Sequence, residues 1–161
     1  MYSAPAFENK LCTAAELATR VAALPRPQVF TNGCFDVLHR GHVTYLAQAR
    51  ALGASLIVGV NSDASVKRQG KGNDRPINSE QDRMIVLAAL ESVSMVVLFD
   101  EDTPLNLITA CRPDILVKGG DWQLANIVGA REVQSWGGEV HSIPFLHQRS
   151  TTSLLNKIRS L

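Results

Sequence analysis

The segment Ser55–Asn61 (SLIVGVN) constrains the fold most strongly, because its apolar residues are consecutive rather than alternating. A strand with one face in water alternates apolar and polar side chains. A strand of a parallel sheet is covered by helices on both faces and is apolar throughout. We therefore predict that this segment is a strand buried on both faces. The polar residues Asn61, Ser62 and Asp63 then mark its carboxyl end.

Strand-like and helical patterns alternate regularly along the rest of the chain. Strands are expected at Val29–Phe30, Ser94–Asp100, Asp114–Trp122 and Glu139–Phe145. Helices are expected at Thr13–Leu24, at His39–Arg50, from Ser79 to about Leu90, at Thr103–Arg112, at Leu124–Trp136 and after Ser150. The stretch VKRQGKGNDRPIN, which includes residues 67–75, is predicted to be a basic loop. This alternation predicts an α/β fold with a single doubly wound parallel sheet and right-handed crossovers.

Length and composition exclude several classes of protein. A chain of 161 residues is expected to form one domain over 1–161, with residues 1–26 as a helical extension. The net charge of +1 does not indicate a nucleic-acid partner. The three cysteines are an odd number without a C-x-x-C pair, which argues against a disulfide framework or a cysteine zinc site. Neither a signal peptide nor a membrane span is expected, so we predict a cytoplasmic protein.

Residues 28–52 read as strand, tight loop and helix, with His39 and His42 at the start of the helix. Residues three apart lie on one face of a helix. The first backbone N–H groups of a helix lack intrahelical partners and carry the positive end of its dipole. Two imidazoles at such a helix start predict a site for a phosphate chain. Gly41 between them would let a ligand approach the backbone closely.

Two other loops follow predicted strands and carry unusual side chains: K-G-G-D-W at 118–122 and R-S-T-T at 149–152. Alone, each signal is weak, since paired glycines usually mark a turn and Ser or Thr usually caps a helix. The carboxyl ends of parallel strands, however, meet at one edge of a sheet, which is where such folds bind ligands. The three loops are therefore predicted to converge on one site, with the basic loop of residues 67–75 beside it.

The run G-C-F-D-V-L-H-R-G-H resembles the H-x-G-H signature of the nucleotidyltransferase superfamily. The longer stretch 31–68 resembles the heptose 1-phosphate adenylyltransferases of bacterial lipopolysaccharide synthesis, and the resemblance extends from Phe30 to Ile158. K-G-G-D-[WY] is typical of that branch, and S-T-T resembles the second signature of the superfamily. One departure is that Gln148 and Arg149 precede S-T-T, where many relatives have a glycine and an aromatic or small residue.

This resemblance implies a Rossmann-like nucleotidyltransferase fold and the stand-alone form of an activity that many bacteria fuse to a sugar kinase. The sugar 1-phosphate oxygen would attack the α-phosphorus of ATP, releasing pyrophosphate and forming ADP-heptose. Mg²⁺ would accompany ATP, with no metal ligands from the protein. The expected partners are ATP and the sugar 1-phosphate, together with a second copy in a homodimer, and neither nucleic acid nor membrane.

The resemblance also implies roles for individual residues. The expected catalytic residues are His39, His42, Lys67 and Arg83, with Lys71 as a further candidate for the β,γ-phosphates. The expected ATP-binding residues are Asn32, Gly33, Cys34, Phe35, Gly41, Asn61, Gly119, Ser150, Thr151 and Thr152. The expected contacts to the sugar phosphate are Asp36, Lys118, Asp121 and Trp122. Which basic residue of the 67–75 loop, or Arg149, contacts the triphosphate stays open. Cys34 is expected to pack rather than to act as a nucleophile.

Two alternatives remain open from the residues alone. One is a related enzyme that uses CTP and glycerol 3-phosphate or a similar phospho-alcohol. The other is a non-catalytic nucleotide-binding module, against which the intact His39, Gly41 and His42 argue. The chain has no G-x-x-x-x-G-K-[ST], no G-x-G-x-x-G after its first strand and no G-x-S-x-G. A P-loop kinase, a dinucleotide-dependent oxidoreductase and a hydrolase with a nucleophile elbow are therefore disfavoured.

Overall fold

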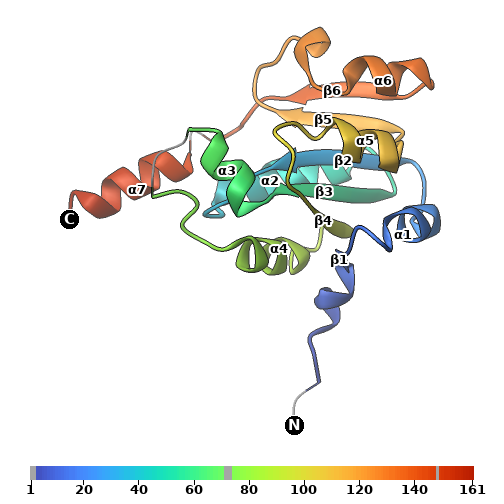
Figure 1. Ribbon diagram of the computed structural model, residues 1–161. Coiled ribbons are helices and arrows are strands. Elements are labelled where there is room, and N and C mark those ends of the chain that lie inside the picture. The colour runs from blue at the N-terminus through green and yellow to red at the C-terminus, as the bar shows by residue number, and fades with distance from the viewer. Residues whose placement is uncertain (1–2, 71–73, 148) are drawn as a thin grey trace.

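The computed structural model describes residues 3–70, 74–147 and 149–161 of the chain. At its centre lies a six-stranded sheet in the order β1-β4-β3-β2-β5-β6, in which every paired strand is parallel to its neighbour (Figure 1). The predicted doubly wound parallel sheet is confirmed. The strands are β1 (Leu11–Cys12), β2 (Gln28–Gly33), β3 (Ser55–Asn61), β4 (Met95–Phe99), β5 (Ile115–Gly119) and β6 (Glu139–Ile143).

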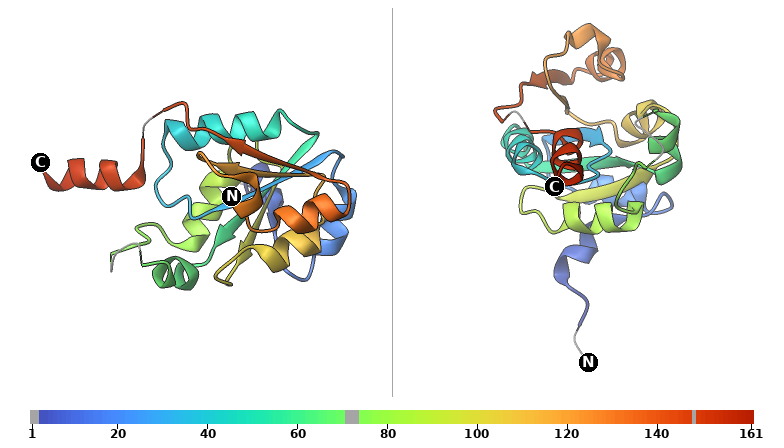
Figure 2. Two further views of the ribbon diagram at one scale, coloured as in Figure 1. Left: turned by 90° about the horizontal axis from the view of Figure 1, so that it is seen from above. Right: turned by 90° about the vertical axis from the view of Figure 1, so that its left-hand side faces the viewer.

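Helices cover both faces of this sheet (Figures 1 and 2). The α-helices are α1 (Leu17–Ala23), α2 (Arg40–Arg50), α3 (Asp63–Arg68), α4 (Glu80–Ala88), α5 (Leu105–Cys111), α6 (Ala130–Ser135) and α7 (Thr151–Arg159). Two short 3₁₀ helices, η1 (Ala6–Lys10) and η2 (Leu124–Asn126), complete the described elements. Among the described helices, none is long and apolar enough to span a membrane.

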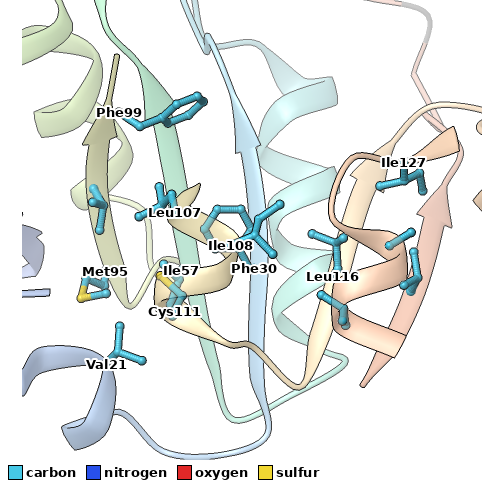
Figure 3. Packing of buried hydrophobic residues seen from close by; sticks show 14 of the residues in the cluster. Val21, Phe30, Ile57, Met95, Phe99, Leu107, Ile108, Cys111, Leu116 and Ile127 are labelled. Carbon is cyan, nitrogen blue, oxygen red and sulfur yellow. The ribbon is translucent and has the colours of Figure 1, made fainter. Parts of the chain in front are cut away.

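Two hydrophobic cores lie on opposite faces of the sheet because successive strand residues point in opposite directions. On β2, Phe30 packs into the core formed with α1, α5 and α6, which Figure 3 shows, whereas Val29 packs into the core formed with α2 and α4. Every residue of β3 is buried. The prediction of a strand covered on both faces is therefore confirmed with its bounds, and the central strands β2 and β3 form a fixed base for the loops at their carboxyl ends.

The structure differs from the sequence-based expectations in three segments. The helix expected at 124–136 is broken into η2 and α6, because Gly129 has a φ of 87° and a Cβ there would lie 2.7 Å from Ile108 Cδ1. The start of the expected basic loop forms the helix α3, whose first turn is capped by Ser62. Near the N-terminus, β1 pairs with β4, and α1 begins only at Leu17.

The order of the strands places a crevice beside β2. The chain passes from β2 to β3 and β4 on one side, and then returns to the other side of β2 for β5 and β6. Where the direction of winding reverses, the connections leave the sheet in opposite directions and open a crevice at the carboxyl ends. The loops after β2 and β5 therefore border the position at which a ligand is expected.

Candidate active site

Two adjoining pockets open at the carboxyl ends of β2 and β5, and Asn32 and Lys118 line both. The pocket of about 160 Å³ is called here the histidine pocket, and it is lined by Asn32, Gly33, Cys34, Phe35, His42, Tyr45, Lys118, Gly119 and Phe145. The pocket of about 110 Å³ is called the side pocket, and it is lined by Asn32, Pro104, Leu116, Val117, Lys118, Trp122, Asn126, Ile127 and Val128. A ligand with two chemically different parts could occupy both pockets across the β2–β5 crevice.

The two histidines stack on each other at the start of α2. Their ring centroids lie 3.8 Å apart with an interplanar angle of 20°, and the edge of Phe35 meets His42 at 5.4 Å. The Nδ1 atoms of both rings are buried without a hydrogen-bond partner among the described residues. Buried polar atoms are normally paired, so two orphaned nitrogens at a helix start make the histidine pair a candidate for contact with a ligand. Phe35 has a φ of 46°, a strained conformation of the kind found at functional sites.

Burial keeps both imidazoles neutral at neutral pH. Desolvation, assisted by the neighbouring His39, lowers the pKa of His42 to about 4. Desolvation and the nearby Arg149 also lower the pKa of His39. A neutral imidazole still offers one N–H donor, while negative charge arriving from a phosphate chain favours protonation of either ring. The pair is thus suited to holding an anion on which charge increases during a reaction.

This low pKa predicts a pH dependence of stability to which His42 should contribute. An unfolded histidine titrates near its ordinary value of 6.5, whereas the folded His42 titrates at about 4. Between these values the unfolded chain binds the extra proton, so the free energy of unfolding falls as the pH is lowered through the window. In urea denaturation at pH 7 and pH 5, we expect a smaller fall for His42→Gln than for the wild type. Equal falls in both proteins would contradict this assignment.

At two positions a glycine is required because an aromatic ring of the protein occupies the space that a Cβ would fill. A Cβ on Gly41 would lie 3.0 Å from two atoms of the His39 ring, so Gly41 lets that ring lie against α2. A Cβ on Gly119 would lie 2.7 Å from the ring of Phe145, which packs over this backbone. The sequence predicted that Gly41 lets a ligand approach the backbone, whereas in the structure the nearest neighbour of a Cβ at this position is the His39 ring.

The histidine pocket contains two residues that the sequence argument did not identify. Tyr45 lies beneath the pocket, where its hydroxyl group is 2.6 Å from Thr31 Oγ1 and donates to the carbonyl oxygen of Val117 at 3.3 Å. Burial raises the pKa of Tyr45 to about 12, so the hydroxyl stays protonated. The half-exposed Phe145 follows β6, and its ring meets that of Tyr45 at 5.8 Å. The available signal for Tyr45 was its position three residues after His42.

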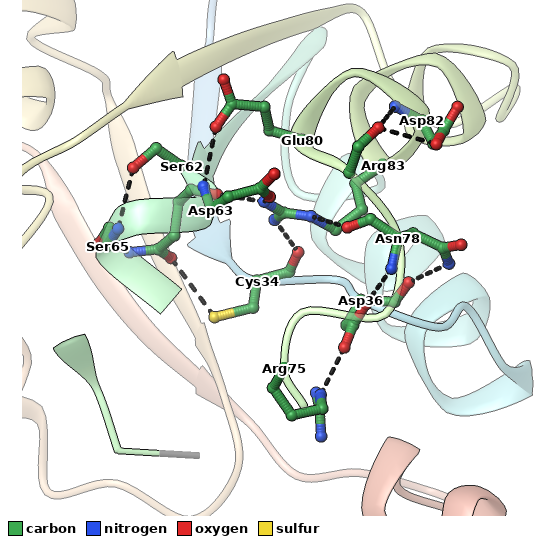
Figure 4. A network of polar contacts seen from close by, with 12 residues as sticks. Cys34, Asp36, Ser62, Asp63, Ser65, Arg75, Asn78, Glu80, Asp82 and Arg83 are labelled. Carbon is green, nitrogen blue, oxygen red and sulfur yellow. Dashed lines mark hydrogen bonds and ion pairs between the residues drawn. The ribbon is translucent and has the colours of Figure 1, made fainter. Parts of the chain in front are cut away.

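Three of the predicted site residues are buried and line neither pocket: Arg83, Asp36 and Asn61. Figure 4 shows the polar contacts of Arg83 and Asp36. The side chain of Arg83 is 0 % exposed and donates to the carbonyl oxygens of Cys34 and Asn61 and to the Asp63 carboxylate. Asp36 is buried, and its carboxylate accepts hydrogen bonds from Arg75 and from two backbone N–H groups. Asn61 donates to Ser65 Oγ at 3.0 Å. The first two expected roles, a phosphate contact for Arg83 and a sugar-phosphate contact for Asp36, do not fit this geometry.

The predicted residues of α3 and α7 that the structure describes line neither the histidine pocket nor the side pocket. Lys67 is exposed in the last turn of α3, and Lys71 lies outside the described residues. Ser150 caps α7 by accepting the backbone N–H of Ser153 at 3.0 Å. Thr151 donates its hydroxyl to the carbonyl oxygen of Val37 at 3.3 Å, which joins the start of α7 to the loop before His39.

The K-G-G-D-W segment forms the rim between the two pockets. Trp122 donates its indole N–H to the carbonyl oxygen of Gly119 at 3.0 Å, and Lys118 Nζ lies 5.8 Å from the centre of its ring. Gly120 allows this turn with a φ of 109°. The side chains of Asp121, in this rim, and of Thr152, in the first turn of α7, are exposed. In residues 3–70, 74–147 and 149–161, no three His, Cys, Asp or Glu side chains form a cluster that could hold a metal ion.

Comparison with known sequences gives one family and close relatives over the full chain. A family model described as cytidylyltransferase-like matches residues 30–160. The chain is 57% identical to the D-beta-D-heptose 1-phosphate adenylyltransferase of Bordetella bronchiseptica, over 98% of both chains. It is also 53% identical to the bifunctional protein HldE of Koribacter versatilis, but there it spans 96% of its own length and 32% of the relative's.

A solved structure gives the same fold. The lipopolysaccharide core biosynthesis protein from Thermoplasma volcanium superposes with a TM-score of 0.61 and 27% sequence identity. The match covers 76% of this chain and 98% of that protein. The predicted Rossmann-like nucleotidyltransferase fold is thereby confirmed, with the histidine pocket at the reversal point of its sheet.

Proposed function

The chain belongs to the cytidylyltransferase-like family, and we propose that it transfers AMP from ATP to a heptose 1-phosphate, releasing pyrophosphate and forming ADP-heptose. One observation carries the reaction type: His42, with an unpartnered Nδ1 atom and with His39 stacked on its ring, lines the histidine pocket at the start of α2. The identity of 57% to the adenylyltransferase of Bordetella bronchiseptica supports the choice of substrates. The product would serve the synthesis of a lipopolysaccharide core or another surface polysaccharide.

The proposed chemistry is a direct displacement at the α-phosphorus of ATP. A phosphate oxygen of the sugar 1-phosphate forms the new P–O bond as the bond to pyrophosphate breaks, and the electron pair leaves with pyrophosphate. Such a step asks the protein to hold both reactants in line and to stabilise charge on the phosphoryl oxygens. His39 and His42 would donate hydrogen bonds to the triphosphate, and the N-terminus of α7 with Thr152 would face it from the other side.

The divalent ion fits this scheme as part of a complex with the nucleotide. Phosphate oxygens are the ligands that Mg²⁺ prefers, and in such sites it keeps several waters and few protein ligands. The described residues offer no preformed cluster of acidic side chains for it, so we expect Mg²⁺ to enter bound to ATP. When bound there, it would neutralise charge on the leaving pyrophosphate.

We assign the expected substrate contacts according to the pocket that each residue lines. Asn32, Gly33, Cys34, Phe35 and Gly119 line the histidine pocket and are proposed to contact ATP. Lys118 and Trp122, which line the side pocket, are proposed to contact the sugar phosphate together with Asp121. Lys67 and Arg149 remain the described cations proposed for the triphosphate, because Arg83 has its hydrogen-bond donors committed elsewhere. We propose a cytoplasmic location, where ATP is available, and a homodimer.

Pyrophosphate release tests this function directly. The purified chain is assayed with ATP or CTP, each with Mg²⁺, against D-glycero-β-D-manno-heptose 1-phosphate and glycerol 3-phosphate. We expect turnover only with ATP and the heptose phosphate. Turnover with CTP and glycerol 3-phosphate would keep the fold and the displacement but replace the substrates. Silence in all four mixtures, from protein shown to be folded by circular dichroism, would contradict the proposal.

A further inference from the structure

The carboxylate of Asp36 is buried in the loop that leads from β2 to the two histidines. This loop, residues 34–39, is called here the histidine loop. The Asp36 side chain is 1 % exposed, so its charge is removed from water and must be compensated inside the protein. It lies three residues before His39, at a point where the backbone has already left the sheet.

Every described partner of this carboxylate comes from one short segment, residues 75–78 (Figure 4). The backbone N–H of Ile77 donates to Oδ1 at 2.8 Å, and that of Asn78 donates to Oδ1 at 2.9 Å. Arg75, itself nearly buried, donates its Nε–H to Oδ2. The Asn78 side chain returns a bond of 2.6 Å to the carbonyl oxygen of Asp36. With both oxygens engaged, the carboxylate has no free face for a ligand.

A second buried charge holds the same loop from the side of the sheet. Arg83 donates to the carbonyl oxygen of Cys34 at 2.6 Å and to that of Asn61 at 2.8 Å, which joins the histidine loop to the end of β3. Arg83 also donates to the carbonyl oxygen of Asn78 at 3.2 Å. The segment 75–78 is therefore fixed to α4 by Arg83 and to the histidine loop by Asp36.

From this arrangement we propose that Asp36 is a positioning residue for the transfer reaction: it fixes the histidine loop against residues 75–78 and so sets where His39 and His42 meet the triphosphate. This inference rests on the proposed function. A carboxylate that contacted the substrate phosphate would repel it, whereas one that bonds only to the protein behind the loop can act without touching the substrate. The same contacts hold the chain where it returns from the basic loop to α4.

The Asp36→Asn variant tests the proposal, because it keeps the shape of the side chain but removes its charge and one acceptor. Misplacing a catalytic group by about 1 Å costs about 10²-fold in rate. We therefore expect kcat for pyrophosphate release to fall by about 10²-fold while KM for ATP changes by less than about threefold. The NMR titration of the His42 ring should move from a pKa of about 4 toward 6.5 as the loosened loop admits water.

Asp114→Asn is the control at the opposite edge of the sheet, and its carboxylate has the same types of partner but is more exposed than that of Asp36. The Asp114 carboxylate also accepts a backbone N–H, from Gln28 at 2.6 Å, and an arginine, Arg26. A merely structural aspartate should behave like this control, with a lower Tm but unchanged kcat and an unchanged His42 titration. If Asp36→Asn matches the control in kcat and in the His42 titration, the proposal is overturned.

Two further results keep the test decisive. If Asp36→Asn does not fold, Asn78→Ala replaces it in the test, because it removes only the side-chain bond to the Asp36 carbonyl oxygen. This variant should also lower kcat and raise the pKa of His42. If neither value changes, the proposal is overturned. If the wild type itself releases no pyrophosphate, the proposed function fails. The His42 titration then still decides whether Asp36 sets the geometry of the histidine pair.

Discussion

His42→Ala should fold normally and lose about 10²–10³-fold in kcat for pyrophosphate release, the scale of removing one preorganised hydrogen-bond donor. The stacked pair explains the size of this effect. His42 lines the histidine pocket, and His39 and Phe35 contact its ring. An imidazole held in place before the substrate arrives costs no reorganisation during the reaction. KM for ATP should change much less than kcat, because the missing donor acts on charge that develops during transfer.

The control for this prediction is His141→Ala. His141 lies on β6, where its ring pairs with the exposed Glu139, and it does not line either pocket at the crevice. Its replacement should leave kcat within about twofold of the wild type, since surface substitutions away from such features have small effects. A His42→Ala enzyme with normal turnover would remove that histidine from the proposed mechanism.

Arg83→Ala should lower the free energy of unfolding by about 3–5 kcal/mol, the usual cost of removing one partner of a buried charge network. The substitution leaves the carbonyl oxygens of Cys34, Asn61 and Asn78 without this donor and deprives Asp63 of its cation. It also opens a cavity at a fully buried position, which adds to the loss. Urea denaturation at pH 7 measures the difference.

Arg26→Ala provides the comparison, because Arg26 forms an exposed ion pair with Asp114 in which the side chains are 53% and 36% exposed. Exposed pairs contribute about 0–1 kcal/mol, so this variant should stay close to the wild type. The Arg83 experiment also distinguishes two roles. Normal stability with a lost affinity for ATP would return Arg83 to the phosphate contact that the sequence suggested, and a large loss of stability assigns it to the support of the histidine loop.

The sequence predicted those strands and helices whose bounds depend on the burial of a whole segment. Ser55–Asn61 has the bounds expected of it, because a strand covered on both faces leaves a continuous apolar run. The helix expected at 124–136 was wrong, since the pattern of apolar residues does not reveal that Gly129 must adopt a positive φ beside Ile108. The helix α3 was missed because its short sequence is mostly polar, although Ser62 before it is a good cap.

In the site, likewise, some features were predicted from the sequence and others were not. The strand order brings Asn32, His42, Lys118 and Gly119 together as the topology argument predicted. The sequence could not distinguish a charged side chain that faces a ligand from one that is consumed inside the protein. Arg83 and Asp36 belong to the second kind, and their partners are mainly backbone groups, which every residue possesses and no motif records. Phe145 was missed because a lone phenylalanine after a strand usually belongs to a core.

Because the direction of winding reverses at β2, the two walls of the crevice are encoded by separate parts of the gene. The wall with the histidines is encoded before residue 100, and the wall with Lys118, Trp122 and Phe145 is encoded after residue 114. Mutations that reshape the second wall therefore leave the coding segment for the histidine pair untouched. Changes in the last third of such a gene can therefore reshape the wall of Lys118, Trp122 and Phe145, while the stacked histidines are inherited unchanged.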